Sequence, residues 1–206
     1  LIRWVANLSM LFGEVPFMER FERAARAGFR YVEYLFPYGL DVEAVAAELR
    51  RGGLEQVLFN LPAGDWAAGE RGIANDPARR QAFRDGVEHA VDIARRLGVR
   101  RLNCLVGLQR RDVPEAEQRA CLVDNLRHAA DRLAAHGILL LVEPLNTQDV
   151  PGFFLTSTRQ ALALLEEVGR PNVRIQYDVY HMQIMEGNLT HTLRTHVGRI
   201  GHVQID

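Results

Sequence analysis

The sequence predicts one α/β domain over residues 1–206 with the architecture of a (β/α)8 TIM barrel. Short apolar segments alternate with longer amphipathic segments, which is the pattern of a parallel sheet covered by helices. Polar residues stand where several of the short segments end, and active sites of such barrels lie at that edge of the sheet. A Gly-rich phosphate turn does not follow the first strand, which disfavours the doubly wound alternative.

The first part of the chain contains three predicted strands, at residues 2–6, 31–36 and 54–60. Between them we expect two helices, at residues 16–27 and 41–51. Phe17, Phe21 and Ala24 recur at helical spacing in the first helix, which Gly28 ends. Asp41 is a favourable N-cap for the second helix, and a Gly pair follows its last residue.

The second part of the chain repeats the same unit four times. We expect helices at residues 77–97, 114–136, 157–168 and 188–197. Each helix precedes a predicted strand, at residues 100–107, 138–143, 172–178 and 199–205. Pro77 and Pro114 suit the first turn of a helix, and Gly98 and Gly137 suit the position after the last turn.

The strand count gives seven, whereas a closed barrel of this type has eight. We therefore expect the 206-residue chain to stop after its seventh strand, without the eighth βα unit. The longest irregular stretch, residues 61–76, follows the third strand, where a barrel carries an active-site loop.

The composition excludes several classes of chemistry. All 25 basic residues are Arg, so the chain has no Lys amine for a Schiff base, pyridoxal phosphate or a P-loop. The formal net charge of -1 argues against nucleic acid and anionic membranes as partners. Cys104 and Cys121 are predicted to be free thiols. No secretion signal or membrane span is indicated, so we expect a cytoplasmic protein with a small-molecule substrate.

Three polar residues at strand ends are predicted to hold one divalent cation. Glu143 ends an apolar strand, and burial of a carboxylate there is costly without a counter-charge. Asp178 ends the next predicted strand. Two neighbouring carboxylates repel each other unless a cation lies between them. Gln204 adds an amide oxygen from the seventh strand. Oxygen ligands favour Mg²⁺ or Mn²⁺ over zinc.

Other polar residues are candidates for contacts with the substrate. His181 lies one helical turn after Asp178, and Arg71 is in the long loop, where it can clamp a carboxylate. Trp66 is a candidate in the same loop, and its alternative is a buried anchor of an ordinary surface loop. Asn7 and Asn60 at strand ends are the remaining candidates, and their alternative is to serve only the local backbone. Gln176 and His202 are expected inside the barrel, either beneath the cation site or merely bonded to each other.

Several segments together resemble the hydroxypyruvate isomerase family of xylose-isomerase-like barrels. They are NLSMLFGE, NLPAGDWAAGERGIA, NCLVG, LVEPLN, PGFFLT, IQYDVYHMQIMEG and GHVQI. The resemblance extends over essentially the whole chain, and the long AGDWAAGERG loop is its most specific part. It implies an isomerase of glyoxylate metabolism that interconverts hydroxypyruvate and 2-hydroxy-3-oxopropanoate (tartronate semialdehyde), with a homo-oligomer as a possible state.

The resemblance also implies roles for the residues that stand in the family's motifs. Glu143 is then both a ligand of the cation and a proton-transfer residue, and Asp178 and Gln204 are further ligands. The family's opposing acid/base is a second Glu on the eighth strand, which has no counterpart in this sequence. On that ground we expect the 206-residue chain alone to be weakly active or inactive.

Three other functions compete with this interpretation. A ketose 3-epimerase of the same superfamily has a His where Gln204 stands, and the AGDWAAGERG loop is not typical of it. An apurinic endonuclease of this fold binds several zinc ions through many His, whereas here strands end in Asn60 and Asn103. A non-catalytic barrel that binds a sugar or a partner is the third alternative.

Overall fold

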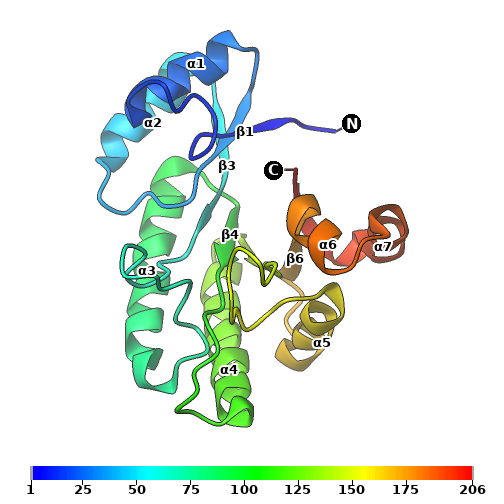
Figure 1. The fold of residues 1–206 in the computed structure, drawn as a ribbon. Coiled ribbons are helices and arrows are strands. Elements are labelled where there is room, and N and C mark those ends of the chain that lie inside the picture. The colour runs from blue at the N-terminus through cyan, green and yellow to red at the C-terminus, as the bar shows by residue number, and fades with distance from the viewer. Residues whose placement is uncertain (1, 206) are drawn as a thin grey trace.

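Seven parallel strands lie side by side in chain order in the computed structural model, which describes residues 2–205 (Figure 1). The strands are β1 (Val5–Asn7), β2 (Tyr31–Glu33), β3 (Glu55–Asn60), β4 (Arg101–Cys104), β5 (Leu139–Val142), β6 (Val173–Asp178) and β7 (Ile200–Gln204). The helices are α1 (Arg20–Arg26), α2 (Val42–Gly52), α3 (Arg80–Leu97), α4 (Glu115–Ala134), α5 (Thr158–Val168), α6 (Val179–Met185) and α7 (Leu189–His196). The seven predicted strands and their helical connections are confirmed.

The sheet curves into a half-barrel, so that side chains of distant strands meet on its inner face. Gln204 of β7 donates from Nε2 to Glu33 Oε1 of β2 at 2.7 Å, although these strands are far apart in the order of the sheet. Arg101 of β4 donates from Nε to the Gly201 carbonyl of β7 at 3.1 Å. A flat sheet of this strand order would keep these residues far apart.

The first two strands are shorter than the sequence predicts. Leu35 lies within the predicted second strand, but its backbone N–H bonds to the Ser9 hydroxyl at 2.9 Å instead of joining the sheet. After β1, the N–H groups of Met10 and Leu11 donate to the Asn7 carbonyl, which turns the chain. These short strands leave irregular backbone near the carboxyl ends of β1 and β2.

The apolar core lies mainly between the sheet and the helices. One large cluster joins the outer faces of β3 to β6 with α3, α4 and α5, and a second surrounds Phe21 and Tyr34 near the N-terminus. A smaller cluster fills the inside of the curved sheet with Val57, Leu58 and Leu141. Because apolar side chains fill part of the interior, the polar side chains at the carboxyl ends of the strands form a separate layer.

Several helix ends follow the capping pattern of the sequence. The Asp41 and Ser157 side chains accept hydrogen bonds from backbone N–H groups in the first turns of α2 and α5. Gly98 has a left-handed conformation after α3, as does Gly169 after α5. These caps mark the start or the end of α2, α3 and α5.

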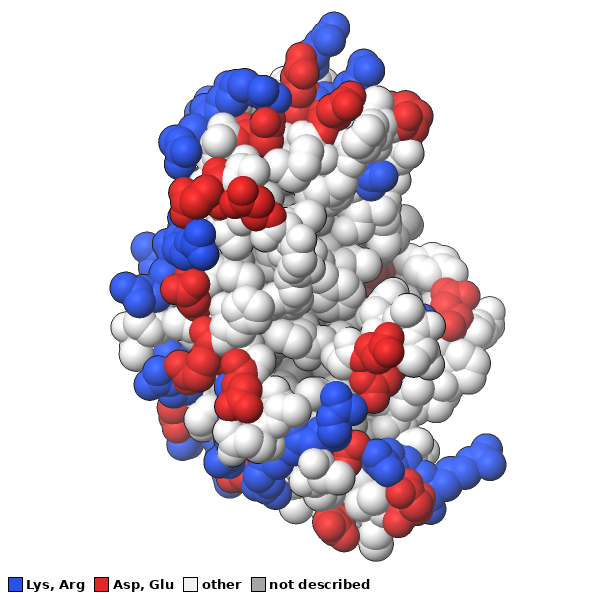
Figure 2. Space-filling view, turned by 90° about the vertical axis from the view of Figure 1, so that its left-hand side faces the viewer, with Lys and Arg blue, Asp and Glu red and all other residues white. Residues whose placement is uncertain are grey.

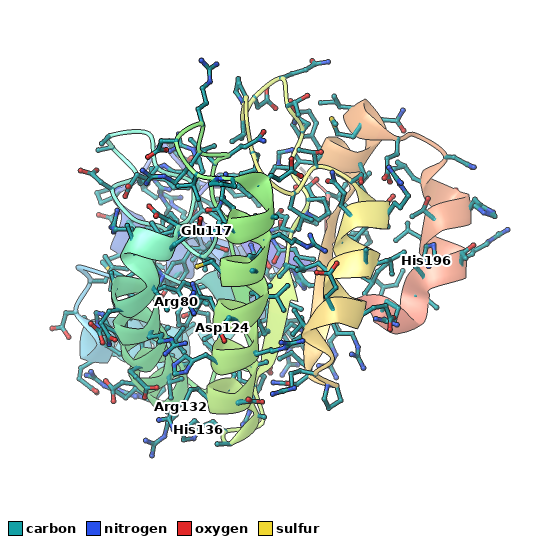
Figure 3. The ribbon with its side chains drawn as sticks, turned by 90° about the horizontal axis from the view of Figure 1, so that it is seen from below. Arg80, Glu117, Asp124, Arg132, His136 and His196 are labelled. Atoms are coloured by element: carbon teal, nitrogen blue, oxygen red, sulfur yellow. The ribbon has the colours of Figure 1, made fainter. Side chains whose placement is uncertain are left out.

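Several Arg side chains on the outer surface pair with acidic side chains. Arg80 of α3 pairs with Asp124 of α4 (Figure 3). Arg132 pairs with Glu88 across the same two helices. Arg and acidic side chains are interspersed on the face shown in Figure 2. Within the described residues, no helix combines the length and apolar composition needed to cross a bilayer.

Both cysteines are free and buried. Burial raises the pKa of the Cys104 thiol to about 12 and also raises the pKa of Cys121. A thiol with such a pKa is protonated at neutral pH and is a poor nucleophile. Cysteine chemistry therefore does not contribute to the candidate site.

Candidate metal centre and active site

Two acidic side chains meet at the carboxyl ends of β5 and β6. Glu143 directly follows β5, is only 6% exposed, and accepts a hydrogen bond at Oε2 from Asn103 Nδ2 of β4 at 2.9 Å. Asp178 is the last residue of β6 and is 1% exposed. Its Oδ1 caps α6 by accepting from the N–H groups of Tyr180 and His181, whereas Oδ2 accepts no hydrogen bond from the described residues.

His181 stands beside this pair of carboxylates. Its Nε2 lies 3.8 Å from Asp178 Oδ2, and its Nδ1 contacts the Asn146 side-chain amide nitrogen at 2.7 Å. Ligand atoms of Glu143, Asp178 and His181 all lie within 4.8 Å of one another. The structure therefore brings the predicted substrate-contacting His181 into ligand distance of the two predicted metal carboxylates.

This arrangement suits a divalent cation. Two carboxylates buried close together repel, and a positive charge between them removes that repulsion. Asp178 Oδ2 is a buried anionic oxygen that accepts no hydrogen bond from the described residues, although buried polar atoms normally have a partner. A cation at this point would supply the missing partner, so the residues present fit such a group.

Gln204 is the neighbour of Asp178 across the β6–β7 pair, where the two residues are in register. Each end of its amide makes one hydrogen bond inside the barrel. Nε2 donates to Glu33 Oε1 at 2.7 Å, and Oε1 accepts from Gln176 Nε2, also at 2.7 Å. His202 Nε2 lies 2.7 Å from the other oxygen of Glu33. Gln176 and His202 thus belong to a buried polar layer that includes Gln204.

Three residues of this site were missed by the sequence reasoning. Glu33 is the buried last residue of β2, but the predicted strand continues to residue 36, so Glu33 does not stand at a strand end in the sequence. Asn103 and Asn146 are fully buried and contact Glu143 and His181, respectively. Asn103 and Asn146 make these contacts between neighbouring strands or the segments that follow them, whereas the Glu33 contact with β7 requires the curvature of the sheet.

The two Asn residues that were predicted as substrate contacts have different surroundings. Asn60 is buried at the end of β3, and its Oδ1 accepts from Asn103 Nδ2 at 3.0 Å. The same Asn103 amide nitrogen donates to both Asn60 and Glu143. Asn7 Oδ1 accepts from the Ser9 backbone N–H at 3.1 Å, which is the local backbone role considered as its alternative.

Trp66 and Arg71 come together in the long loop after β3. The Arg71 guanidinium carbon lies 3.9 Å from the centre of the Trp66 ring, and Arg71 Nη1 donates to the Glu70 carbonyl at 2.8 Å. Trp66 packs edge-on against Phe36 with 5.1 Å between ring centres, yet remains 39% exposed. Stacking and hydrogen bonding thus hold the Arg71 side chain within the loop.

The base of this loop is fastened to the chain that follows β4. Gly72 has a φ of 112°, and a Cβ there would lie 1.9 Å from the Leu105 carbonyl oxygen. Gly107 has a φ of 121°, and a Cβ there would lie 2.1 Å from Asn75 Oδ1. Only Gly permits both the backbone conformation and this close approach. The backbone hydrogen bond from Asn75 to the Val106 carbonyl, at 3.1 Å, joins the same segments.

Asp149 provides a further negative charge near His181. Asn146 Nδ2 and the Tyr180 hydroxyl both donate to Asp149 Oδ2, at 2.8 Å and 2.7 Å. These hydrogen bonds, that of Asn146 most strongly, hold the pKa of the Asp149 carboxyl below its ordinary value. Asp149 is therefore ionised at neutral pH, and it anchors the Asn146 amide that contacts His181.

The sequence was compared with protein families and with curated proteins. A family model described as "Xylose isomerase-like TIM barrel" matches residues 21–206. The chain is 55% identical to hydroxypyruvate isomerase of Escherichia coli (strain K12), over 100% of this chain and 80% of that protein. It is 44% identical to 2-oxo-tetronate isomerase of Cupriavidus necator, over 98% of this chain and 78% of that protein.

A solved structure shares the fold closely. A crystal structure from Brucella melitensis, described as AP endonuclease, family 2, superposes with a TM-score of 0.97 at 48% sequence identity. The match covers 100% of this chain and 79% of that chain. The half-barrel and its site residues therefore lie within the part of the fold that the two proteins share.

Proposed function

The chain belongs to the xylose isomerase-like TIM barrel family and is an isomerase, and we propose that it interconverts hydroxypyruvate and 2-hydroxy-3-oxopropanoate with one divalent cation. The observation that carries the proposal is the cluster of Glu143, Asp178 and His181, in which a buried carboxylate oxygen accepts no hydrogen bond from the described residues. The 55% identity to a hydroxypyruvate isomerase supports the choice of substrate.

Glu143 is the proposed proton-transfer residue. The reaction moves a proton between two adjacent carbons of the substrate, and an enediolate forms between the removal of the proton and its return. The Glu143 carboxylate would take the proton from the hydroxymethyl carbon, while Asn103 holds the carboxylate in place through Oε2. Its burial keeps bulk water away from the proton that it carries.

Asp178, Glu143 and Gln204 would hold the cation, which we propose to be Mg²⁺ or Mn²⁺ because most of the ligand atoms are oxygens. When bound, the cation supplies positive charge that stabilises the developing negative charge on the substrate oxygens. His181 lies close enough to the same point to hold a substrate hydroxyl or to act as a further ligand. Asn146 fixes the orientation of the His181 ring.

The test of this function is a metal-dependent assay. A chain extended through an eighth strand is treated with EDTA and incubated with hydroxypyruvate, with and without added Mn²⁺ or Mg²⁺, and formation of the semialdehyde is followed by NMR. We expect activity to disappear after chelation and to return with the metal, because the carboxylates cannot stabilise the enediolate charge themselves. Turnover that is equally fast in EDTA would rule out the proposed use of a cation.

The second candidate substrate is 2-oxo-tetronate, which is favoured by the 44% identity to a 2-oxo-tetronate isomerase. It has one more carbon than hydroxypyruvate and keeps the 2-oxo-acid group. The same assay with both acids and a ketohexose separates the possibilities. A kcat/KM higher for 2-oxo-tetronate would reassign the substrate, and epimerisation of the ketohexose would favour the epimerase alternative.

Arg71 is proposed to bind the substrate carboxylate. Its replacement by Met is expected to raise KM for hydroxypyruvate by about 10–100-fold, because a hydrogen bond to a charged group contributes about 1.5–3 kcal/mol. Steady-state kinetics measure this, and kcat should change less than KM. Arg132→Met on the outer surface of α4 is the matched control (Figure 3). An unchanged KM in Arg71→Met would show that the loop does not bind the carboxylate.

A further inference from the structure

Glu33 is a buried carboxylate that lies close to two residues of β7. It is only 3% exposed at the end of β2. Oε1 accepts from Gln204 Nε2 at 2.7 Å, and Oε2 lies 2.7 Å from His202 Nε2. Among the described residues only Oε1 accepts a hydrogen bond, and rotation of the carboxylate would break that bond to Gln204. A buried acidic group held in this way needs a role, since an apolar residue would avoid the cost of burial.

The contact with Gln204 determines which end of its amide faces which neighbour. The oxygen and nitrogen ends of a Gln amide have nearly the same shape, so packing alone cannot distinguish the two orientations. A carboxylate only accepts hydrogen bonds, and the amide nitrogen of Gln204 must therefore face Glu33. The amide oxygen of Gln204 then points away from Glu33.

Gln176 reinforces the same orientation from β6. Its Nε2 donates to Gln204 Oε1 at 2.7 Å, which is possible only when the oxygen end of Gln204 faces β6. Asp178 lies on β6 directly beside Gln204 in register. An amide oxygen has two lone pairs, so the hydrogen bond from Gln176 leaves one of them for a cation.

We propose that Glu33 is a positioning residue that orients Gln204 so that its amide oxygen, and not its NH₂ group, is presented to the divalent cation beside Asp178. This inference rests on the proposed function, because it requires a cation at the carboxylate cluster. It assigns a task to the buried acidic residue on β2, which itself lies outside the Glu143, Asp178 and His181 cluster. Glu33 acts through Gln204 and does not touch the substrate.

The experiment uses two reciprocal substitutions and measures Mn²⁺ affinity. The protein is stripped of metal with EDTA, the EDTA is removed, and Mn²⁺ binding is followed by EPR titration. Glu33→Gln removes the acceptor-only group that constrains the Gln204 amide from β2, and we expect Mn²⁺ affinity to fall about 10–100-fold, as is typical when a partner of a metal ligand is removed. Gln204→Glu places a second carboxylate against Glu33, and the repulsion should also weaken Mn²⁺ binding.

The double variant Glu33→Gln/Gln204→Glu separates orientation from simple loss of packing. The amide introduced on β2 can donate to the carboxylate introduced on β7, so the pair is again complementary, with donor and acceptor exchanged. We expect Mn²⁺ affinity to recover to within a few-fold of wild type. Glu55→Gln at the exposed start of β3 is the matched control and should bind Mn²⁺ like wild type.

Each outcome decides the proposal. Weak binding in both single variants with recovery in the double variant supports it. Wild-type affinity in Glu33→Gln overturns it, and so does a double variant that binds no better than the single ones. Thermal unfolding in EDTA checks that all variants are folded. If the wild-type protein binds no Mn²⁺, both the cation part of the proposed function and this inference are wrong. If only the variants fail to bind Mn²⁺, the proposed function stands.

Discussion

Replacing Glu143 by Gln is expected to lower kcat for hydroxypyruvate by about 10²–10⁴-fold, because a Gln amide cannot accept and return a proton. The side chain keeps its shape, and its carbonyl oxygen can still accept the hydrogen bond from Asn103 Nδ2. The fold and the KM for the substrate should therefore change little. Steady-state kinetics with saturating Mn²⁺, together with thermal unfolding, measure these effects.

The control for this substitution is Glu117→Gln on the outer surface of α4 (Figure 3). It makes the same chemical change in an exposed residue, and kcat should remain at the wild-type value. A Glu143→Gln variant with more than about a tenth of wild-type kcat would contradict the assignment of Glu143 as the proton-transfer residue. Loss of Mn²⁺ binding in the same variant would show that Glu143 acts mainly as a ligand.

Replacing Asp178 by Asn is expected to weaken Mn²⁺ binding by more than about 100-fold, which exceeds the loss typical for partners of a ligand. The Asn side chain can still cap α6, because its oxygen can accept from the Tyr180 and His181 N–H groups. In EDTA the variant should be at least as stable as wild type, because one of two neighbouring carboxylates has lost its charge. Addition of Mn²⁺ should then stabilise wild type alone.

Asp178→Ala separates the two functions of this side chain. It removes the cap as well as the ligand, and we expect the free energy of unfolding in EDTA to fall by about 1 kcal/mol relative to Asp178→Asn. Chemical denaturation measures this difference. Wild-type Mn²⁺ affinity in Asp178→Asn would refute the placement of the cation at Asp178.

The fold could be predicted in some detail because its signals are local. Hydrophobic periodicity, the Asp41 and Ser157 caps and the Gly residues that follow several helices depend on neighbouring residues, and the structure reproduces the predicted elements. Errors are concentrated where a side chain replaces a backbone partner. The Ser9 hydroxyl, which takes the Leu35 N–H and shortens β2, is the clearest case.

The site could be predicted only in part, because its contacts are not local. Glu143 and Asp178 are conspicuous in the sequence as charges that end apolar strands. Glu33 ends a strand of three residues, too short to show the same contrast. Its contact with Gln204 spans 171 positions of the chain and depends on the curvature of the sheet. Asn103 resembles an ordinary polar residue until its amide is seen between Asn60 and Glu143.

The fastened base of the loop after β3 has a consequence for how tightly a small substrate can bind. Fixing the backbone of one flexible residue costs about 1–2 kcal/mol in conformational entropy. A ligand contributes at most about 1.5 kcal/mol for each of its non-hydrogen atoms, and a three-carbon acid has very few. Ordering a loose loop would consume most of that free energy. Because Gly72 and Gly107 hold the base and Asp65 bonds to Ala68 within the tip, the loop is already ordered before substrate arrives.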